Sequence, residues 1–122
     1  MHELPFVMKL LGETDAVASQ QGFQRIGRIR IEVGALSGIE PECVRLYFET
    51  AGEGHAAEGA ELEFVVDPAM LICETCGNEF AHEPERARAE GEDPFICPRC
   101  GRDGRLKKGT GSGARLLSVE GQ

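Results

Sequence analysis

Four of the chain's five cysteines form two Cys-x-x-Cys pairs, Cys73/Cys76 and Cys97/Cys100, which are separated by twenty residues. A glycine follows each pair and allows the backbone to turn without a Cβ clash. Two such pairs supply four thiolates, which form the complete tetrahedral shell of a structural zinc ion. Because a closed shell leaves no position for a substrate, the pattern predicts a metal that holds structure and does no catalysis.

Disulfide bonds and a redox-active pair are the two alternative interpretations of these cysteines. Disulfides belong to oxidising compartments, and the N-terminus lacks the cationic and apolar leader of a secreted protein. A redox Cys-x-x-Cys needs one pair at a helix start, whereas this chain carries two matched pairs. Zinc is therefore favoured over both.

The first three residues, Met1-His2-Glu3, combine an α-amine, an imidazole and a carboxylate. Nitrogen-rich ligand sets suit Ni(II) or Cu(II), and added carboxylate and water favour six-coordination. By themselves, however, these residues favour a simpler interpretation, in which His2 is solvated and Glu3 complements the positive end of a helix dipole. Metal binding here is a hypothesis that needs further context.

Two helices are expected ahead of the cysteines. The first spans residues 4–21, and the spacing of its apolar residues predicts one buried face made of Leu4, Val7, Met8 and Leu11. The second begins at Pro41, where a first-turn proline is tolerated, and ends near Gly52.

Alternating apolar residues predict strands at 28–33 and 61–66, and a short final strand at 116–119 that returns to the same sheet. The expected fold is α+β: two helices on an antiparallel three-stranded sheet, with a four-cysteine, zinc-ribbon-like lobe inserted between two strands. The expected domains are 1–69 plus 110–122 and, for the zinc lobe, 70–109. The residues between the cysteine pairs, 83–93, are expected to form a loop.

The net charge of −8 argues against a nucleic-acid-binding surface, since phosphate contacts require basic residues. The acidic excess belongs to residues 1–72. No apolar stretch approaches membrane-spanning length, so we expect a cytoplasmic protein without membrane contact.

Segments along nearly the whole chain together match one family. They are Met1-His2-Glu3-Leu4, the loop Gly34-Ala35-Leu36-Ser37-Gly38-Ile39-Glu40-Pro41-Glu42, Phe48-Glu49, Ala57-Glu58-Gly59-Ala60-Glu61-Leu62, and the two cysteine pairs with their glycines, Gly77 and Gly101. In this order they resemble the HypA/HybF family of hydrogenase nickel-incorporation proteins.

The resemblance implies a nickel metallochaperone and not an enzyme; the sequence also offers no nucleophile–base set. It implies that His2 binds Ni(II) as exchangeable cargo, that Glu3 is a ligand or its close supporter, and that the four cysteines hold zinc. We add the α-amine of Met1 and the carboxylate of Glu40 as further nickel ligands to test. Glu40 has an equally good role as an acid at a helix start.

The resemblance also implies partners. These are a HypB-type GTPase, the large subunit of a [NiFe]-hydrogenase and, for some members of the family, urease maturation proteins. Any self-association is expected to be a weak homodimer.

The sequence departs from the family pattern in two places. Pro5-Phe6 replaces a small polar and aliphatic pair, and the gap between the cysteine pairs is longer than expected. The odd cysteine, Cys43, is expected to be an ordinary buried thiol, and His55 and His82 have no place in the pattern.

A zinc-ribbon module that binds nucleic acid is the alternative function. A cationic cluster favours it: Arg99, Arg102, Arg105, Lys107 and Lys108. The net charge and the scarcity of aromatic residues near these cations argue against it.

Overall fold

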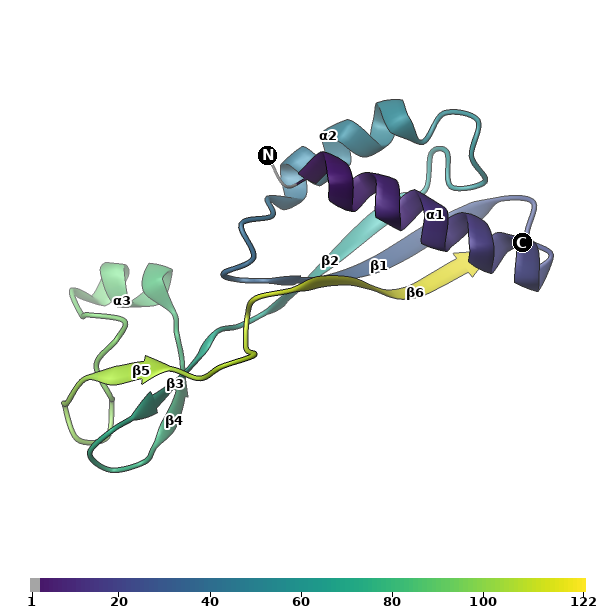
Figure 1. Cartoon of the computed structure of the whole chain (residues 1–122). Coiled ribbons are helices and arrows are strands. Elements are labelled where there is room, and N and C mark those ends of the chain that lie inside the picture. Colours follow the sequence, from purple (N-terminus) through teal and green to yellow (C-terminus); the bar gives the residue numbers. More distant parts are fainter. Residues whose placement is uncertain (1–2) are drawn as a thin grey trace.

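The computed structural model describes residues 3–122, which form three helices and six strands in two three-stranded sheets (Figure 1). The elements are α1 (Glu3–Gln21), β1 (Ile26–Gly34), α2 (Pro41–Ala51), β2 (Glu61–Asp67), β3 (Met70–Cys73), β4 (Glu79–Ala81), α3 (Pro84–Glu90), β5 (Gly104–Leu106) and β6 (Ala114–Gly121). The first sheet has the order β2-β1-β6 and the second β4-β3-β5. The α+β class is confirmed.

The sequence predicted an antiparallel first sheet, but the observed sheet is mixed. Strand β1 pairs with β6 in the antiparallel sense but with β2 in parallel, so that Ile29 lies opposite both Val119 and Leu62. The reason is the helix between the two parallel strands: α2 carries the chain back to the end where β1 began, and β2 then runs in the same direction.

The final strand returns to the first sheet as predicted, and it is longer than expected. The residues between β2 and β6 therefore form an insertion, which contains the second sheet and α3. Figure 1 shows this insertion at one end of the molecule, away from the helix-covered sheet. We call residues 70–109 the cysteine lobe; their folding as a separate domain stays a prediction.

Helices α1 and α2 cover one face of the first sheet (Figure 1). The core between them is a cluster of buried side chains: Phe6, Val7, Leu10, Leu11, Ala18, Ile26, Ile29, Ile31, Val33, Val44, Phe48, Ala57 and Leu62. The expected buried face of α1 is correct for Val7 and Leu11 but wrong for Leu4 and Met8, which are 47% and 55% exposed. The true stripe is rotated so that Phe6 and Leu10, one turn apart, point at the sheet.

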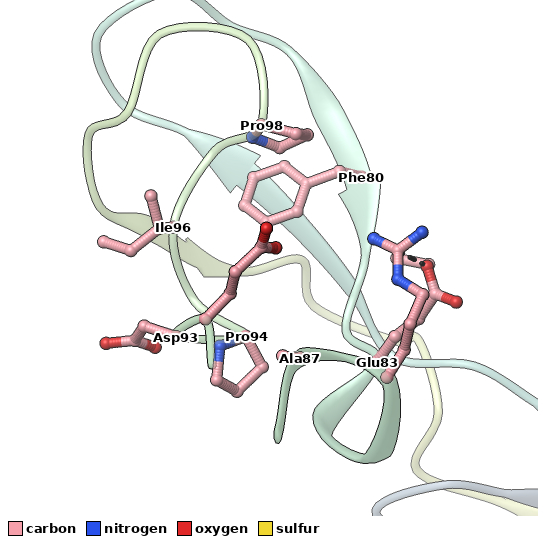
Figure 2. Close-up of a pocket in the computed structure, with 10 residues that line it drawn as sticks. Phe80, Glu83, Ala87, Asp93, Pro94, Ile96 and Pro98 are labelled. Carbon is pink, nitrogen blue, oxygen red and sulfur yellow. Dashed lines mark ion pairs between the residues drawn. The ribbon is translucent and has the colours of Figure 1, made fainter. Parts of the chain in front are cut away.

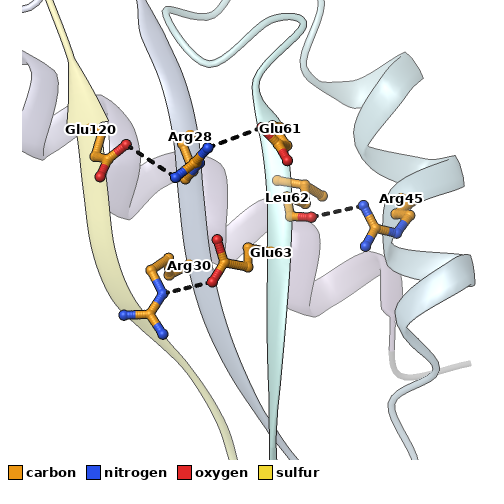
Figure 3. Close-up of polar contacts among 7 residues, drawn as sticks. All are labelled: Arg28, Arg30, Arg45, Glu61, Leu62, Glu63 and Glu120. Carbon is orange, nitrogen blue, oxygen red and sulfur yellow. Dashed lines mark hydrogen bonds and ion pairs between the residues drawn. The ribbon is translucent and has the colours of Figure 1, made fainter.

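The opposite face of the first sheet carries charged side chains (Figure 3). Arg28 lies between Glu61 at 3.6 Å and Glu120 at 3.8 Å, and Arg30 lies 3.1 Å from Glu63. These side chains are about half exposed, so each pair contributes no more than about 1 kcal/mol. The ion pairs mark this face as solvated, and stability comes from the covered face.

The loop after β1 forms backbone hydrogen bonds with the two chain segments that lead into and out of the cysteine lobe. The backbone N–H of Leu36 donates to Gly111 O at 2.6 Å, and that of Ala35 donates to Asp67 O at 2.9 Å. A Cβ on Gly34 would lie 2.4 Å from the Gly111 oxygen, and Gly111 has a φ of +67°. The junction is therefore packed backbone against backbone, and glycine is required on both sides.

Within residues 3–122, the helices are too short or too polar to cross a membrane.

Candidate metal centre

The two cysteine pairs lie on two equivalent turns of the second sheet. Cys73 ends β3 and its turn leads into β4, while the turn that starts at Cys97 leads into β5. In each turn the glycine after the second cysteine has a positive φ, and its N–H donates to the carbonyl of the first cysteine at 2.9 Å. The same local sequence thus produces the same turn twice.

The turns bring all four sulfurs together, with their ligand atoms within 4.8 Å of one another. The Sγ atoms of Cys76 and Cys97 are 3.7 Å apart, and those of Cys73 and Cys100 are 3.3 Å apart. Sulfurs placed about 2.3 Å from a zinc ion at tetrahedral angles would be about 3.8 Å apart. The predicted cluster therefore forms, and its size fits one tetrahedral metal ion.

Burial and backbone N–H groups divide the cluster into two kinds of thiol. Cys73 and Cys97 are each 1% exposed, whereas Cys76 and Cys100 are exposed. A hydrogen bond from the backbone of Cys76 is the main cause that lowers the pKa of Cys73. Burial raises the pKa of Cys97, but the backbone N–H groups of Cys100 and Arg99 outweigh it and bring the pKa to about 6. The buried pair is thus prepared to ionise.

Cys100 behaves in the opposite way. The backbone of Arg102 lowers its pKa, but the neighbouring sulfurs, Cys73 first, and burial together raise it to about 12. Four thiolates this close repel one another, so a divalent cation is needed to hold them all ionised. This donor set of four soft sulfurs makes the cluster a structural metal site.

One side chain that supports the cluster is not among the residues predicted from the sequence. Asn78 follows the first pair's glycine, and its Nδ2 donates to Cys97 Sγ at 3.6 Å. Such outer contacts orient metal ligands and stabilise their negative charge. The only signal in the sequence was a polar residue placed directly after the Cys-x-x-Cys-Gly turn.

The second group of candidate metal ligands lies at the start of α1. His2 and the α-amine of Met1 lie outside the described residues, 3–122. Glu3 is 8% exposed, and its Oε2 accepts a hydrogen bond from the backbone N–H of Glu40 at 3.1 Å. The starts of α1 and α2 are therefore side by side, which is the arrangement that the hypothesis for Glu40 required.

Glu40 itself caps α2, because its Oε1 accepts from the N–H of Glu42 at 3.5 Å. The capping role expected for this residue is present. One carboxylate oxygen makes this contact, and the group lies at the corner where Glu3 is anchored.

Three further residues singled out in the sequence are His55, His82 and Cys43. His55 Nδ1 is 2.8 Å from Asp15 Oδ2 and joins the loop after α2 to α1. The ring of His82 packs against Phe95, with centroids 4.7 Å apart. Cys43 is half-buried on α2, less enclosed than predicted. Within residues 3–122, none of the three belongs to a group of three or more side chains that could hold a metal ion.

Known proteins resemble this chain along almost its whole length. The family model described as hydrogenase/urease nickel incorporation, metallochaperone, hypA matches residues 1–121. The chain belongs to the HypA family. A hydrogenase maturation factor HypA from Syntrophus aciditrophicus is 34% identical over 120 residues and 98% of each chain. The factor of the same name from Cereibacter sphaeroides is 33% identical over 122 residues and the whole of both chains.

Solved HypA structures share the fold. The solution structure of the Ni metallochaperone HypA from Helicobacter pylori aligns with a TM-score of 0.60 at 22% identity, covering 98% of this chain and 96% of that one. A second solution structure of a HypA protein gives a TM-score of 0.65 at 24% identity, covering 100% and 97%. The HypA identification made from the sequence is thereby confirmed, as are its link to hydrogenase maturation and nickel incorporation.

Proposed function

We propose that this protein binds Ni(II) at its N-terminus and delivers it, as a carrier and not an enzyme, for the maturation of [NiFe]-hydrogenase. Urease maturation is a second destination in the proposal, since the family description names both enzymes. The proposed partners are a HypB-type GTPase and the hydrogenase large subunit, and the proposed location is the cytoplasm.

The observation that carries this proposal is the separation of two unlike donor sets. Four sulfurs converge in the cysteine lobe, whereas the start of α1 offers a carboxylate anchored to α2. A closed thiolate shell binds soft metals tightly and releases them slowly, while nitrogen and oxygen donors at a chain terminus suit a metal that must be passed on.

In the proposal, His2 is the principal nickel ligand and Glu3 is a ligand or its support, with the Met1 α-amine and Glu40 as additional ligands. The buried contact of Glu3 with the Glu40 backbone supports this assignment. It fixes one carboxylate at the start of α1, so the entropic cost of assembling the proposed site is reduced.

The ion in the cysteine lobe is proposed to be zinc. Cys73, Cys76, Cys97 and Cys100 would be its four ligands, and it would supply no reaction chemistry, only a crosslink between two turns. The sulfur spacing fits a tetrahedral ion, and a four-thiolate shell is typical of structural zinc.

The nucleic-acid alternative loses support from ion pairs on the cysteine lobe. Two members of the cationic cluster are paired, Arg105 with Glu74 at 3.3 Å and Lys107 with Glu79 at 2.6 Å. Paired cations release fewer counterions from phosphate.

Calorimetric titration of Ni(II) into untagged protein tests the proposal. We expect His2→Ala to abolish stoichiometric binding while zinc content, measured by mass spectrometry, stays at one ion per chain. His55→Ala is the matched control, because it removes an imidazole from the same helix-covered part of the chain and should leave nickel binding unchanged. Retained one-to-one nickel binding in His2→Ala would refute the assignment.

A further inference from the structure

The residues between the cysteine pairs, expected to be a loop, form a helix and a pocket. The helix α3 begins with Pro84 in its first turn and ends at Gly91, which has a φ of +71°. After it, the N–H of Glu92 donates to Ala87 O at 2.7 Å, and this bond completes a standard C-terminal helix cap. The twenty-residue gap thus builds defined structure beside the metal cluster.

This helix and the second sheet line a pocket of about 500 Å³ that is open to solvent (Figure 2). Its apolar lining comes from Phe80, Pro94, Ile96 and Pro98, with Ala87 of α3 on another side. The volume lies within the range of roughly 300–1,000 Å³ that is usual for ligand pockets, and it exceeds what one side chain fills.

The polar lining of the pocket has an excess of negative charge. Glu83, Glu92 and Asp93 contribute three carboxylates against the single guanidinium of Arg86. That guanidinium lies 3.8 Å from Glu83, and Asp93 accepts the N–H of Phe95 at 2.9 Å. Glu92 makes neither an ion pair nor a side-chain hydrogen bond within residues 3–122.

The backbone fixes the position of both carboxylates that are not paired with a cation. The helix cap sets the main chain at Glu92, and the turn closed by Phe95 N–H sets Asp93. A cationic group that enters the pocket therefore meets two carboxylates whose backbone is already in place, so little further ordering is required.

We propose that this pocket binds an arginine-bearing segment of a partner protein. A guanidinium is planar, stacks on aromatic and apolar surface, and pairs with carboxylates in a forked geometry. Phe80 and the two prolines supply the flat apolar walls, and Glu92 with Asp93 supply the charge.

The occupant is a peptide segment and not a free small cation, because a second hollow shares a wall with the pocket. This neighbouring groove, of about 520 Å³, is also lined by Glu83 and Arg86. It extends to Val66 in β2 and to Pro68, which lies between β2 and β3. Val66 is 61% exposed. A chain that places arginine in the pocket can therefore continue over apolar surface towards the first sheet.

The test titrates the zinc-loaded protein, without nickel, with a blocked glycine–leucine–arginine–glycine peptide and follows backbone amide shifts by NMR. We expect shifts confined to residues 80–98 and the adjoining groove. A peptide with citrulline, the neutral counterpart of arginine, should bind at least about fivefold more weakly, because it forms no ion pair.

The double variant Glu92→Gln/Asp93→Asn should weaken arginine-peptide binding about tenfold, through the loss of two charge pairs. Asparagine retains the oxygen that accepts Phe95 N–H, so the turn is preserved. Glu58→Gln/Glu90→Gln removes two exposed carboxylates that line neither hollow, and it should bind as the parent protein does.

Three results would overturn the proposal. The first is equal affinity of the arginine and citrulline peptides, and the second is equal loss in both double variants. The third is self-association with shifts at the pocket and at the exposed Arg99 and Arg102, which would make a second copy of this chain the occupant. None of these results depends on nickel, so the proposed cargo site is tested separately.

Discussion

The first sheet and the second sheet each contain three strands, but they are stabilised by different means. The first buries a continuous apolar cluster under α1 and α2, and no metal ligand group among residues 3–122 lies within it. The cysteine lobe buries few large side chains, chiefly Leu71 and the sulfurs of Cys73 and Cys97. A segment of about 40 residues rarely folds on apolar burial alone, so we expect a bound metal to substitute for a core.

This difference explains why the two proposed metal sites differ in chemistry. A metal that replaces a core must stay bound, and four thiolates provide that. A cargo metal must leave, and it is therefore proposed to bind at the edge of a domain whose fold does not depend on it. Under this proposal, metal exchange at the start of α1 leaves the core under α1 and α2 intact.

Removal of one sulfur should have the largest effect on the cysteine lobe and little effect on the first sheet. In Cys97→Ser, zinc should be lost and amides of residues 70–109 should exchange rapidly with deuterium, while those of β1 stay protected. The reason is that zinc contributes roughly 10–16 kcal/mol of apparent free energy in small modules of this kind. Cys43→Ser, outside the cluster, is the matched control and should keep its zinc. Protection of the cysteine lobe in zinc-free Cys97→Ser would contradict the account.

The reciprocal experiment weakens the apolar core. Leu10 is fully buried, and Leu10→Ala should lower the free energy of unfolding by about 2–5 kcal/mol through lost burial and a cavity. Zinc content should be unchanged. Met8→Ala, at an exposed position of the same helix, should change stability by less than about 0.5 kcal/mol. Urea denaturation measures both variants, and equal effects would mean that the core is wrongly placed.

A smaller effect on stability is expected at the junction where Gly34 and the loop after β1 pack against Gly111. Gly34→Ala places a Cβ 2.4 Å from the Gly111 oxygen, so we expect a loss of about 1–3 kcal/mol. The hydrogen bond from Leu36 N–H to Gly111 should exchange faster as the two backbones separate. On the same strand, Gly27 has no atom within 4 Å of an added Cβ, and Gly27→Ala should be tolerated. Equal thermal stability of the two variants would show that the junction does not require close packing.

The metal cluster was predictable from the sequence because its determinants are local. A Cys-x-x-Cys-Gly turn folds in the same way wherever it occurs, and two such turns specify four converging sulfurs. The signals for α3 were also present, since Pro84 and Gly91 stand where helices commonly begin and end. They were outweighed by the mixed charge of the segment, which favoured a loop.

Other features could not be read from local pattern. The direction of β2 depends on how the chain crosses over through α2, and alternation of side chains is the same in parallel and antiparallel strands. On α1, two overlapping stripes share Val7 and Leu11, and only packing on the sheet selects Leu10 over Met8. The approach of Glu3 to Glu40 likewise requires the fold, because 37 positions separate the two residues in the chain.

The central claim, that the two metals bind to different donors in different places, is tested most directly by X-ray absorption on untagged protein loaded with both. The account predicts a zinc edge with four sulfur neighbours at about 2.3 Å and a nickel edge with nitrogen and oxygen neighbours alone. Sulfur in the first shell of nickel, or nitrogen and oxygen ligands on zinc, would contradict it.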